Sequence, residues 1–309
     1  MRYIDPHRHC VSRTTDDYQA MYLAGIRAVV EPSFWLGQPR TSAGTFRDYF
    51  LMILEWERER AGAHGIEHRC TIGLNPKEAN DELLADEVLE MLPELLEREG
   101  VVAVGELGYD SITPAEEKAF IAQVELAKRF GLPVMVHTPH RDKARGTKRT
   151  MDVLADLDVD PARVVIDHST EETTRMILDA GYWAGHTVYP ETKLTPERFT
   201  NIFFDHGVER VTLNSSADWG KSDPLNVPRT AALLESRGAD PEIPGYRGGS
   251  RRITVFGNRT RLKGGFQGEG GRRNCQGGPA ASALYPQEGP RVSGPAPPGA
   301  RAQPCCARS

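Results

Sequence analysis

The sequence predicts an α/β protein, a (β/α)8 TIM barrel, and three observations lead to this prediction. Short apolar runs alternate strictly with amphipathic helical stretches along residues 2–237, which makes eight strand–helix units. The runs are apolar almost without interruption, as parallel strands buried on both faces are. Residue types that bind metals end several of the runs, at what would be one face of the barrel. A doubly wound open sheet is the alternative, but it would gather its site at one crevice.

The eight expected strands are short and rich in branched apolar residues. They cover residues 2–9, 26–30, 69–74, 101–106, 132–137, 164–168, 183–188 and 210–214. The helices are expected at residues 16–24, 45–60, 81–99, 114–130, 147–157, 171–180, 196–206 and 224–237. Gly25, Gly131 and Gly181 end three of them, and Pro114 stands in a first turn, where proline is tolerated. Pro93 predicts a kink or a restart in the third helix.

The composition changes at Arg247. More than half of residues 247–309 are Gly, Pro, Arg or Ala, and the apolar periodicity is lost. We therefore expect a barrel domain over residues 1–246 and a disordered tail over residues 247–309. A second interpretation is that part of the tail is an out-of-frame translation of GC-rich DNA, because these four residues have GC-rich codons.

Charge and composition limit the class of partner. The net charge of −5 combines 27 basic and 41 acidic residues in 1–246 with 11 basic and 2 acidic residues in 247–309. The acidic body argues against binding a polyanion over a broad surface. No stretch is apolar for long enough to cross a membrane, and a strand directly after Met1 leaves no room for a signal peptide. The five cysteines show neither zinc-site spacing nor a disulfide framework, so the cytoplasm is the expected location.

Two histidines end the first expected strand. His7 and His9 are two residues apart, and alternate residues of a strand point to the same face. At the mouth of a barrel, that face could hold a metal ion. Four later strands end in, or lead into, further ligand types: Glu106, His137, His168 and Asp218.

Four histidines and two carboxylates suit one or two divalent ions, of zinc, manganese or magnesium. Imidazole favours zinc-like metals, and a carboxylate can bridge two ions. Two bridged ions can polarise a substrate and acidify a water molecule. Asp218 could then serve as the general base.

The order of these residues resembles the TatD family of metal-dependent hydrolases, which lies within the amidohydrolase-like barrels. The Gly-Glu-Leu-Gly-x-Asp segment is the most specific part, and the similarity covers residues 1–237. The segments that carry it are His7-Arg8-His9, Gly105-Glu106-Leu107-Gly108-Tyr109-Asp110, Pro133-Val134-Met135-Val136-His137, Asp167-His168 and Ser216-Ala217-Asp218.

The resemblance implies a role for each ligand. His7 and His9 would bind one metal ion, His137 and His168 a second, and Glu106 would bridge the two.

The last segment departs from the family. Asp218 would bind metal or activate the water, but Trp219 and Gly220 follow it where the family usually has a short Pro-aromatic turn. The departure indicates a divergent member.

Three residues near this face are candidates for substrate contact. Arg141 opens a basic run over residues 141–149, which is either a clamp for a phosphate or carboxylate or a solvated loop. His186 ends the seventh expected strand and either contacts substrate or is satisfied by hydrogen bonds within the fold. Trp219, beside Asp218, either walls the pocket or packs in the core.

Two classes of function stay open. The first is a metal-dependent hydrolase of an ester-type bond, in a phosphodiester or a small phosphorylated or ester substrate, with an amide or lactone as a variant. The second is a catalytically inactive barrel that serves as a binding or scaffold protein. The expected partner is a small molecule or short nucleic acid, with no membrane and no obligate protein partner. Loss of turnover in Asp218→Ala with the metals retained would favour the enzyme.

Overall fold

The structure is a computed structural model that describes residues 2–239, 252–255 and 258–261. Eight parallel strands follow one another in chain order, and each is hydrogen-bonded to the next. They are β1 Tyr3–Asp5, β2 Ile26–Pro32, β3 Glu67–Ile72, β4 Val101–Gly108, β5 Val134–His137, β6 Val164–Ile166, β7 Trp183–Thr187 and β8 Val211–Asn214.

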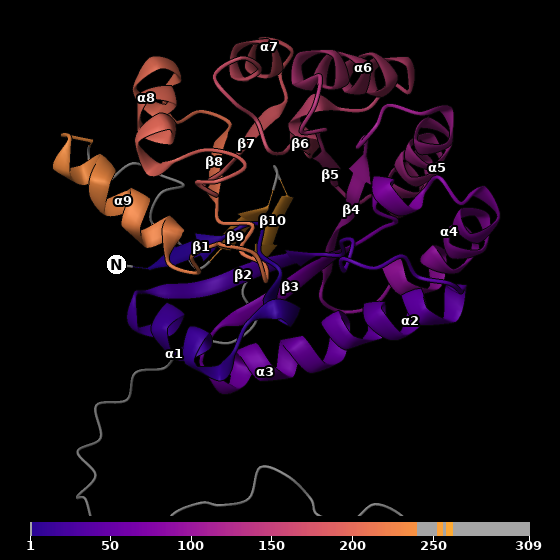
Figure 1. Cartoon of the computed structure of the whole chain (residues 1–309), viewed down its shortest axis with the longest axis horizontal. Helices are drawn as coiled ribbons and strands as arrows, with labels where there is room; N and C mark the ends of the chain where they lie inside the picture. Colours follow the sequence, from indigo (N-terminus) through magenta and orange to yellow (C-terminus); the bar gives the residue numbers. More distant parts are fainter. Residues whose placement is uncertain (1, 240–251, 256–257, 262–309) are drawn as a thin grey trace, which may run out of the picture. The chain divides into compact units, whose positions relative to one another are not determined.

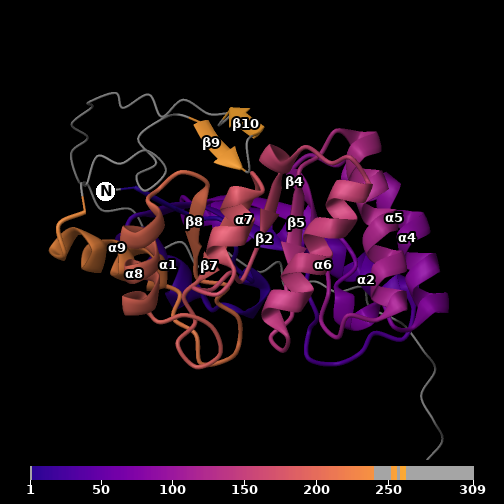
Figure 2. The same ribbon diagram turned by 90° about the horizontal axis from the view of Figure 1, so that it is seen from above.

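Helices connect the strands and lie outside them (Figures 1 and 2). They are α1 Thr15–Leu23, α2 Ala43–Leu51, α3 Glu57–Ala63, α4 Glu82–Leu96, α5 Pro114–Phe130, α6 Lys143–Asp156, α7 Thr174–Asp179, α8 Pro196–His206 and α9 Asn226–Ser236. Parallel strands in chain order with helices between them form a TIM barrel, so the predicted fold class is confirmed.

The barrel is nearly closed, and its seam lies between β1 and β8. In residues 2–239, these two strands share no ladder of their own. Residues just past both strands join them instead. The Ser216 N–H donates to the His7 carbonyl at 2.8 Å, and the His9 N–H donates to the Ala217 carbonyl at 3.1 Å. The loop after β8 is therefore held against the residues that follow β1.

Apolar side chains fill both sides of the strands. A larger cluster joins Ile72, Val104 and Val136 to helices α2, α4 and α5. This burial on two sides explains why the strands read as continuous apolar runs. A separate cluster draws on alternate positions of four strands: Ala28, Val30, Val102, Met135 and Val165.

Some element boundaries differ from the predicted ones. The first strand ends at Asp5 rather than at His9, so both histidines lie in irregular backbone beyond it. The expected helix over residues 45–60 is a succession of α2, a five-residue π-helical segment (Met52–Trp56) and α3. Helix α4 continues through Pro93 without a restart, and its apolar face is buried.

Two short strands lie in the segment that was expected to be a tail. β9 Arg252–Val255 and β10 Asn258–Arg261 pair antiparallel, which composition alone does not predict. The rest of residues 247–309 lies outside the described residues. The predicted disorder of this tail and its out-of-frame origin therefore stay predictions. In the described part of the chain, no helix is both long and apolar enough to cross a membrane.

Candidate metal centre

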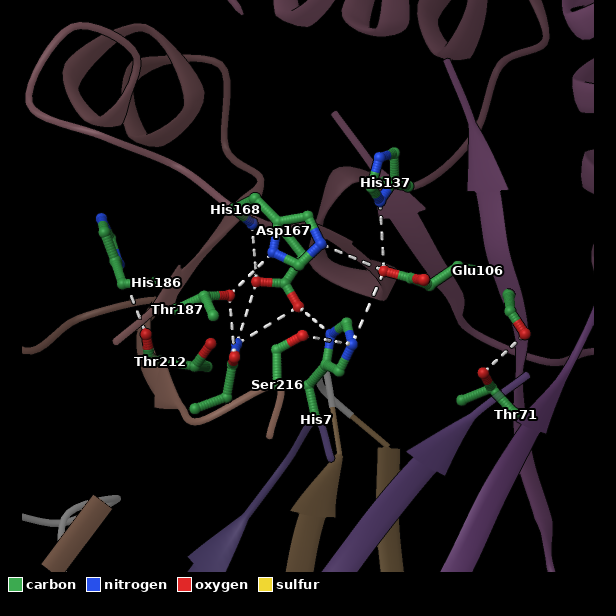
Figure 3. A network of polar contacts seen from close by, with 12 residues as sticks. His7, Thr71, Glu106, His137, Asp167, His168, His186, Thr187, Thr212 and Ser216 are labelled. Carbon is green, nitrogen blue, oxygen red and sulfur yellow. Dashed lines mark hydrogen bonds and ion pairs between the residues drawn. The ribbon is translucent and has the colours of Figure 1, made fainter. Parts of the chain in front are cut away.

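The ends of four strands bring five of the predicted ligands together. His7 and His9 follow β1, Glu106 lies in β4, His137 ends β5, and His168 is two residues past β6. All five side chains are buried. Figure 3 shows three of the imidazole rings pointing toward the carboxylate of Glu106.

A glycine allows the close approach of β4 and β5 at this point. Gly108 pairs with His137 and has a φ of +125°. A Cβ atom on Gly108 would lie 2.5 Å from the carbonyl oxygen of His137. Only glycine therefore lets the two strands meet where they place Glu106 beside His137.

Glu106 is the hub of the cluster. Its Oε1 lies 3.2 Å from Nε2 of His168, 3.3 Å from Nδ1 of His137 and 3.6 Å from Nε2 of His7. Burial by itself would raise the pKa of Glu106, but His7 and His137 outweigh it and hold that pKa well below its usual range. The carboxylate is therefore ionised and able to bind cations.

His7 and His9 face each other through their Nε2 atoms, which are 3.1 Å apart. Burial, and then the neighbouring His7, lower the pKa of His9 well below its usual value. A neutral ring retains a lone pair that can bind a metal. The ring of Phe34 stacks on His9 with centroids 3.5 Å apart and planes 14° apart, which holds it in place.

A chain of hydrogen bonds orients the ligands from behind (Figure 3). Nδ1 of His7 lies 2.5 Å from Oδ2 of Asp167, and Nδ1 of His168 lies 2.7 Å from Oγ1 of Thr187. The Thr187 hydroxyl donates to Asn214, whose amide donates to both oxygens of Asp167. With Nδ1 of each histidine occupied in this way, Nε2 is left to face Glu106.

These side chains fit divalent ions. One nitrogen of His7, one oxygen of Glu106 and one nitrogen of His168 all lie within 4.8 Å of one another. Nε2 of His137 is buried and has no hydrogen-bond partner among the described residues. A buried polar atom left in this way is typical of a site that another group completes. Four imidazoles and a carboxylate form a donor set for zinc or a similar transition metal.

The structure does not bring Asp218 into this cluster. Its Oδ1 accepts hydrogen bonds from the Tyr189 hydroxyl at 2.9 Å and from the Gly220 N–H at 2.8 Å. The residue after β8 that reaches the ligands is Ser216, whose Oγ lies 3.4 Å from Nε2 of His7. The metal-binding role of Asp218 therefore stays a prediction that no contact supports.

The three predicted substrate contacts lie in different surroundings. Arg141 is exposed on the loop between β5 and α6. Trp219 is 51% exposed, and its ring centroid is 5.2 Å from that of Phe34, so it adjoins the ring that stacks on His9.

His186 lies away from the centre. It is fully buried, Nε2 lies 2.9 Å from Oγ1 of Thr174, and the ring packs 5.5 Å from Phe199 of α8. Its neighbour Thr187 faces the ligands instead, because successive side chains of a strand point to opposite faces. The contacts of His186 are therefore those of a histidine satisfied by hydrogen bonds within the fold.

Three orienting residues have no role in the sequence-based prediction: Asp167, Thr187 and Asn214. Asp167 directly precedes a predicted ligand and Asn214 ends the eighth strand, so a signal existed for both. For Thr187 no signal existed, because the phase of side-chain alternation in β7 cannot be read from its sequence.

Comparison with known proteins agrees with this geometry. Residues 4–198 match the family described as TatD related DNase. The chain is 29% identical over 244 residues to an uncharacterized metal-dependent hydrolase of Methanocaldococcus jannaschii, covering 77% of this chain and 93% of that protein.

Solved structures show the same relationship. A TatD-like protein from Archaeoglobus fulgidus superimposes with a TM-score of 0.65 at 29% identity, over 76% of this chain and 94% of that one. A variant of an organophosphorus hydrolase from Deinococcus radiodurans gives a TM-score of 0.55 at 19% identity, over 77% of this chain and 88% of that one, which is a likeness in fold alone. Because the family match spans more than half of the chain and includes the positions of all five clustered residues, the chain belongs to the TatD-related family of metal-dependent hydrolases.

Proposed function

We propose that this protein is a metal-dependent hydrolase that cleaves an ester-type bond, in a phosphodiester or in a small phosphorylated or ester substrate. The observation that carries the proposal is the convergence of three imidazole nitrogens on one oxygen of Glu106, with His9 directly against His7. One or two divalent ions bound here would polarise the substrate and lower the pKa of water.

The side chains divide into two sets of ligands. Nε2 of His7 and Nε2 of His9 would hold one ion. The ring of His137 and Nε2 of His168 would hold a second. Nδ1 of His137 lies 3.3 Å and Nε2 of His168 3.2 Å from Oε1 of Glu106, and Nε2 of His137 has no partner among the described residues. Glu106 faces both sets, as a bridging carboxylate must. The imidazole-rich donor set favours zinc over manganese and magnesium, which prefer oxygen ligands.

Other residues of this chain would position substrate and protons. Phe34 and Trp219 form an apolar wall next to His9. Asp218 is our candidate for the group that accepts a proton from water, and the Tyr189 hydroxyl holds its carboxylate in place. Arg141, on the loop that begins next to His137, would contact the substrate.

The substrate is proposed to be a small molecule or a short nucleic acid. Residues 1–246 carry more acidic than basic side chains, so the surface around the metal centre would repel a long polyanion. We also propose the cytoplasm as the location, since the two described cysteines, Cys10 and Cys70, are buried free thiols.

Elemental analysis of the purified protein tests the metal centre. We expect roughly one to two equivalents of zinc, manganese or a similar ion. The double variant His7→Ala, His9→Ala should lose at least one of them, and His206→Ala, on α8, is the matched control. Hydrolysis of p-nitrophenyl phosphodiesters, phosphomonoesters and lactones should then depend on the bound metal. A wild-type protein that takes up no metal after soaking would refute the proposal.

A further inference from the structure

Two lysine side chains reach the metal centre from different loops. Lys143 is the first residue of α6, and its Nζ donates to Oγ1 of Thr138 at 3.0 Å. Thr138 directly follows His137. Lys193 lies between β7 and α8, and its Nζ donates to Oγ of Ser216 at 3.2 Å. Ser216 in turn contacts the proposed ligand His7. Each ammonium group is therefore hydrogen-bonded to a residue next to a proposed metal ligand.

Among the described residues, no carboxylate lies within ion-pair distance of Nζ of Lys143 or Lys193. Two other cations of α6 are paired: Lys148 lies 2.8 Å from Asp152, and Arg149 contacts Glu117 at 2.5 Å. The basic run after β5 is therefore divided, because Lys143 reaches toward the centre while Lys148 and Arg149 are neutralised on the side of α6.

Both lysines are partly buried, and the pKa of each is lowered. Burial, and then the charge of Lys193, lower the pKa of Lys143 to about 7. Burial also lowers the pKa of Lys193, although the acids Glu106, Asp167 and Asp218 oppose this. Those three acids already have other partners. Glu106 contacts the histidines, Asp167 contacts His7 and Asn214, and Asp218 contacts Tyr189.

Two cations that repel each other and have no carboxylate within ion-pair distance among the described residues are costly, and more so beside bound divalent ions. The positive end of the α6 dipole adds to the unfavourable potential at Lys143. An anion bound at these ammonium groups would relieve this repulsion and accept charge-assisted hydrogen bonds.

We propose that Lys143 and Lys193 bind an oxyanion group of the substrate, a phosphate or a carboxylate, beside the metal centre. The inference rests on the proposed hydrolase function and narrows its substrate to molecules that carry an anionic group. Lys148 and Arg149 are neutralised by their own carboxylates and do not belong to this site.

Calorimetric titration of the metal-loaded protein tests the site. The ligands are inorganic phosphate in one series and acetate in another, at constant ionic strength. We expect Lys143→Met and Lys193→Met each to weaken binding of the preferred anion about tenfold, and the double variant more. Lys148→Met, an exposed lysine of the same helix, is the matched control and should bind like the wild type. Tighter phosphate binding would identify a phosphorylated substrate, and tighter acetate binding a carboxylated one.

The result separates this inference from the proposed function. Metal content and thermal melting are measured on every variant, so a loss of metal or of folding is seen directly. If both lysine variants keep their metal and bind phosphate and acetate as the wild type does, the lysine site is refuted and the metal centre stands. If the wild type holds no metal, the hydrolase proposal fails whatever the lysines bind.

Discussion

The carboxylate of Asp167 lies 2.5 Å from Nδ1 of His7, while Nε2 of the same ring faces Glu106. Asp167 and Glu106 together raise the pKa of His7, against the lowering effect of burial. Asp167 also accepts hydrogen bonds from the His168 N–H and from Asn214. Burial alone would raise the pKa of Asp167, but the charges of His7 and His168 and the hydrogen bonds from these two residues hold it below the usual range. One carboxylate behind the centre thus fixes both the ring orientation and the tautomer of a ligand.

Replacement of this carboxylate should weaken metal binding. Asp167→Asn keeps the shape of the side chain but removes the charge that holds the Nδ1 proton of His7. We expect metal affinity to fall about 10- to 100-fold, as for other residues that orient a ligand histidine. Competition with a chelator of known affinity would measure it, and Asp205→Asn, on the exposed face of α8, is the control. Unchanged affinity in Asp167→Asn would show that the geometry of His7 does not depend on this contact.

Asp218 and Ser216 can be separated as candidates for proton transfer. If Asp218 accepts a proton from water, Asp218→Asn should lower kcat roughly 100-fold or more without changing the metal content. Ser216→Ala, which removes a hydroxyl 3.4 Å from His7, should then have a smaller effect. Single-turnover rates with the best substrate, together with elemental analysis, would decide. A large loss in Ser216→Ala and a small one in Asp218→Asn would remove Asp218 from the mechanism.

The fold could be predicted because local signals and burial agree along most of the chain. Helices α5 and α8 have the predicted bounds, since each has a proline in its first turn, a threonine cap before it and a glycine after its end. The first strand was predicted too long. Its polar residues alternate as in a strand, yet those after Asp5 bond to the loop that follows β8, over 200 residues away in sequence.

The centre could be predicted only in part. Histidines and Glu106 at strand ends are visible in the sequence because their residue types are rare in apolar runs. The role of Asp167 depends on which ring lies across the barrel from it, and that is set by the closure of the seam. Either His186 or Thr187 could face the ligands, since both are polar. Which of them does so depends on which face of β7 each side chain points to, and the sequence does not give this.

The exposed ring of Trp219 should matter for substrate binding more than for stability. It lies against Phe34 at the edge of the centre and is 51% exposed. We expect Trp219→Ala to raise KM about three- to tenfold, which matches the contribution of an aromatic contact. The free energy of unfolding should change by less than about 1 kcal/mol. Trp56→Ala is the matched control, since that ring is 52% exposed and lies in the π-helical segment. Equal KM values for both variants would place Trp219 outside the substrate site.

The stability of the fold should depend on pH through His186. Burial lowers the pKa of this histidine to about 4, whereas its value in the unfolded chain is 6.5. Between these two values the unfolded chain binds a proton that the folded protein excludes, so stability is complete above pH 6.5 and falls as the pH drops toward 4. The loss at pH 4 amounts to roughly 3 kcal/mol. His186→Gln cannot take up this proton. The variant should be less stable than the wild type at pH 7, and the difference should shrink by that amount at pH 4. Urea unfolding of both proteins across this range measures it, and two parallel stability curves would show that His186 does not titrate as its burial requires.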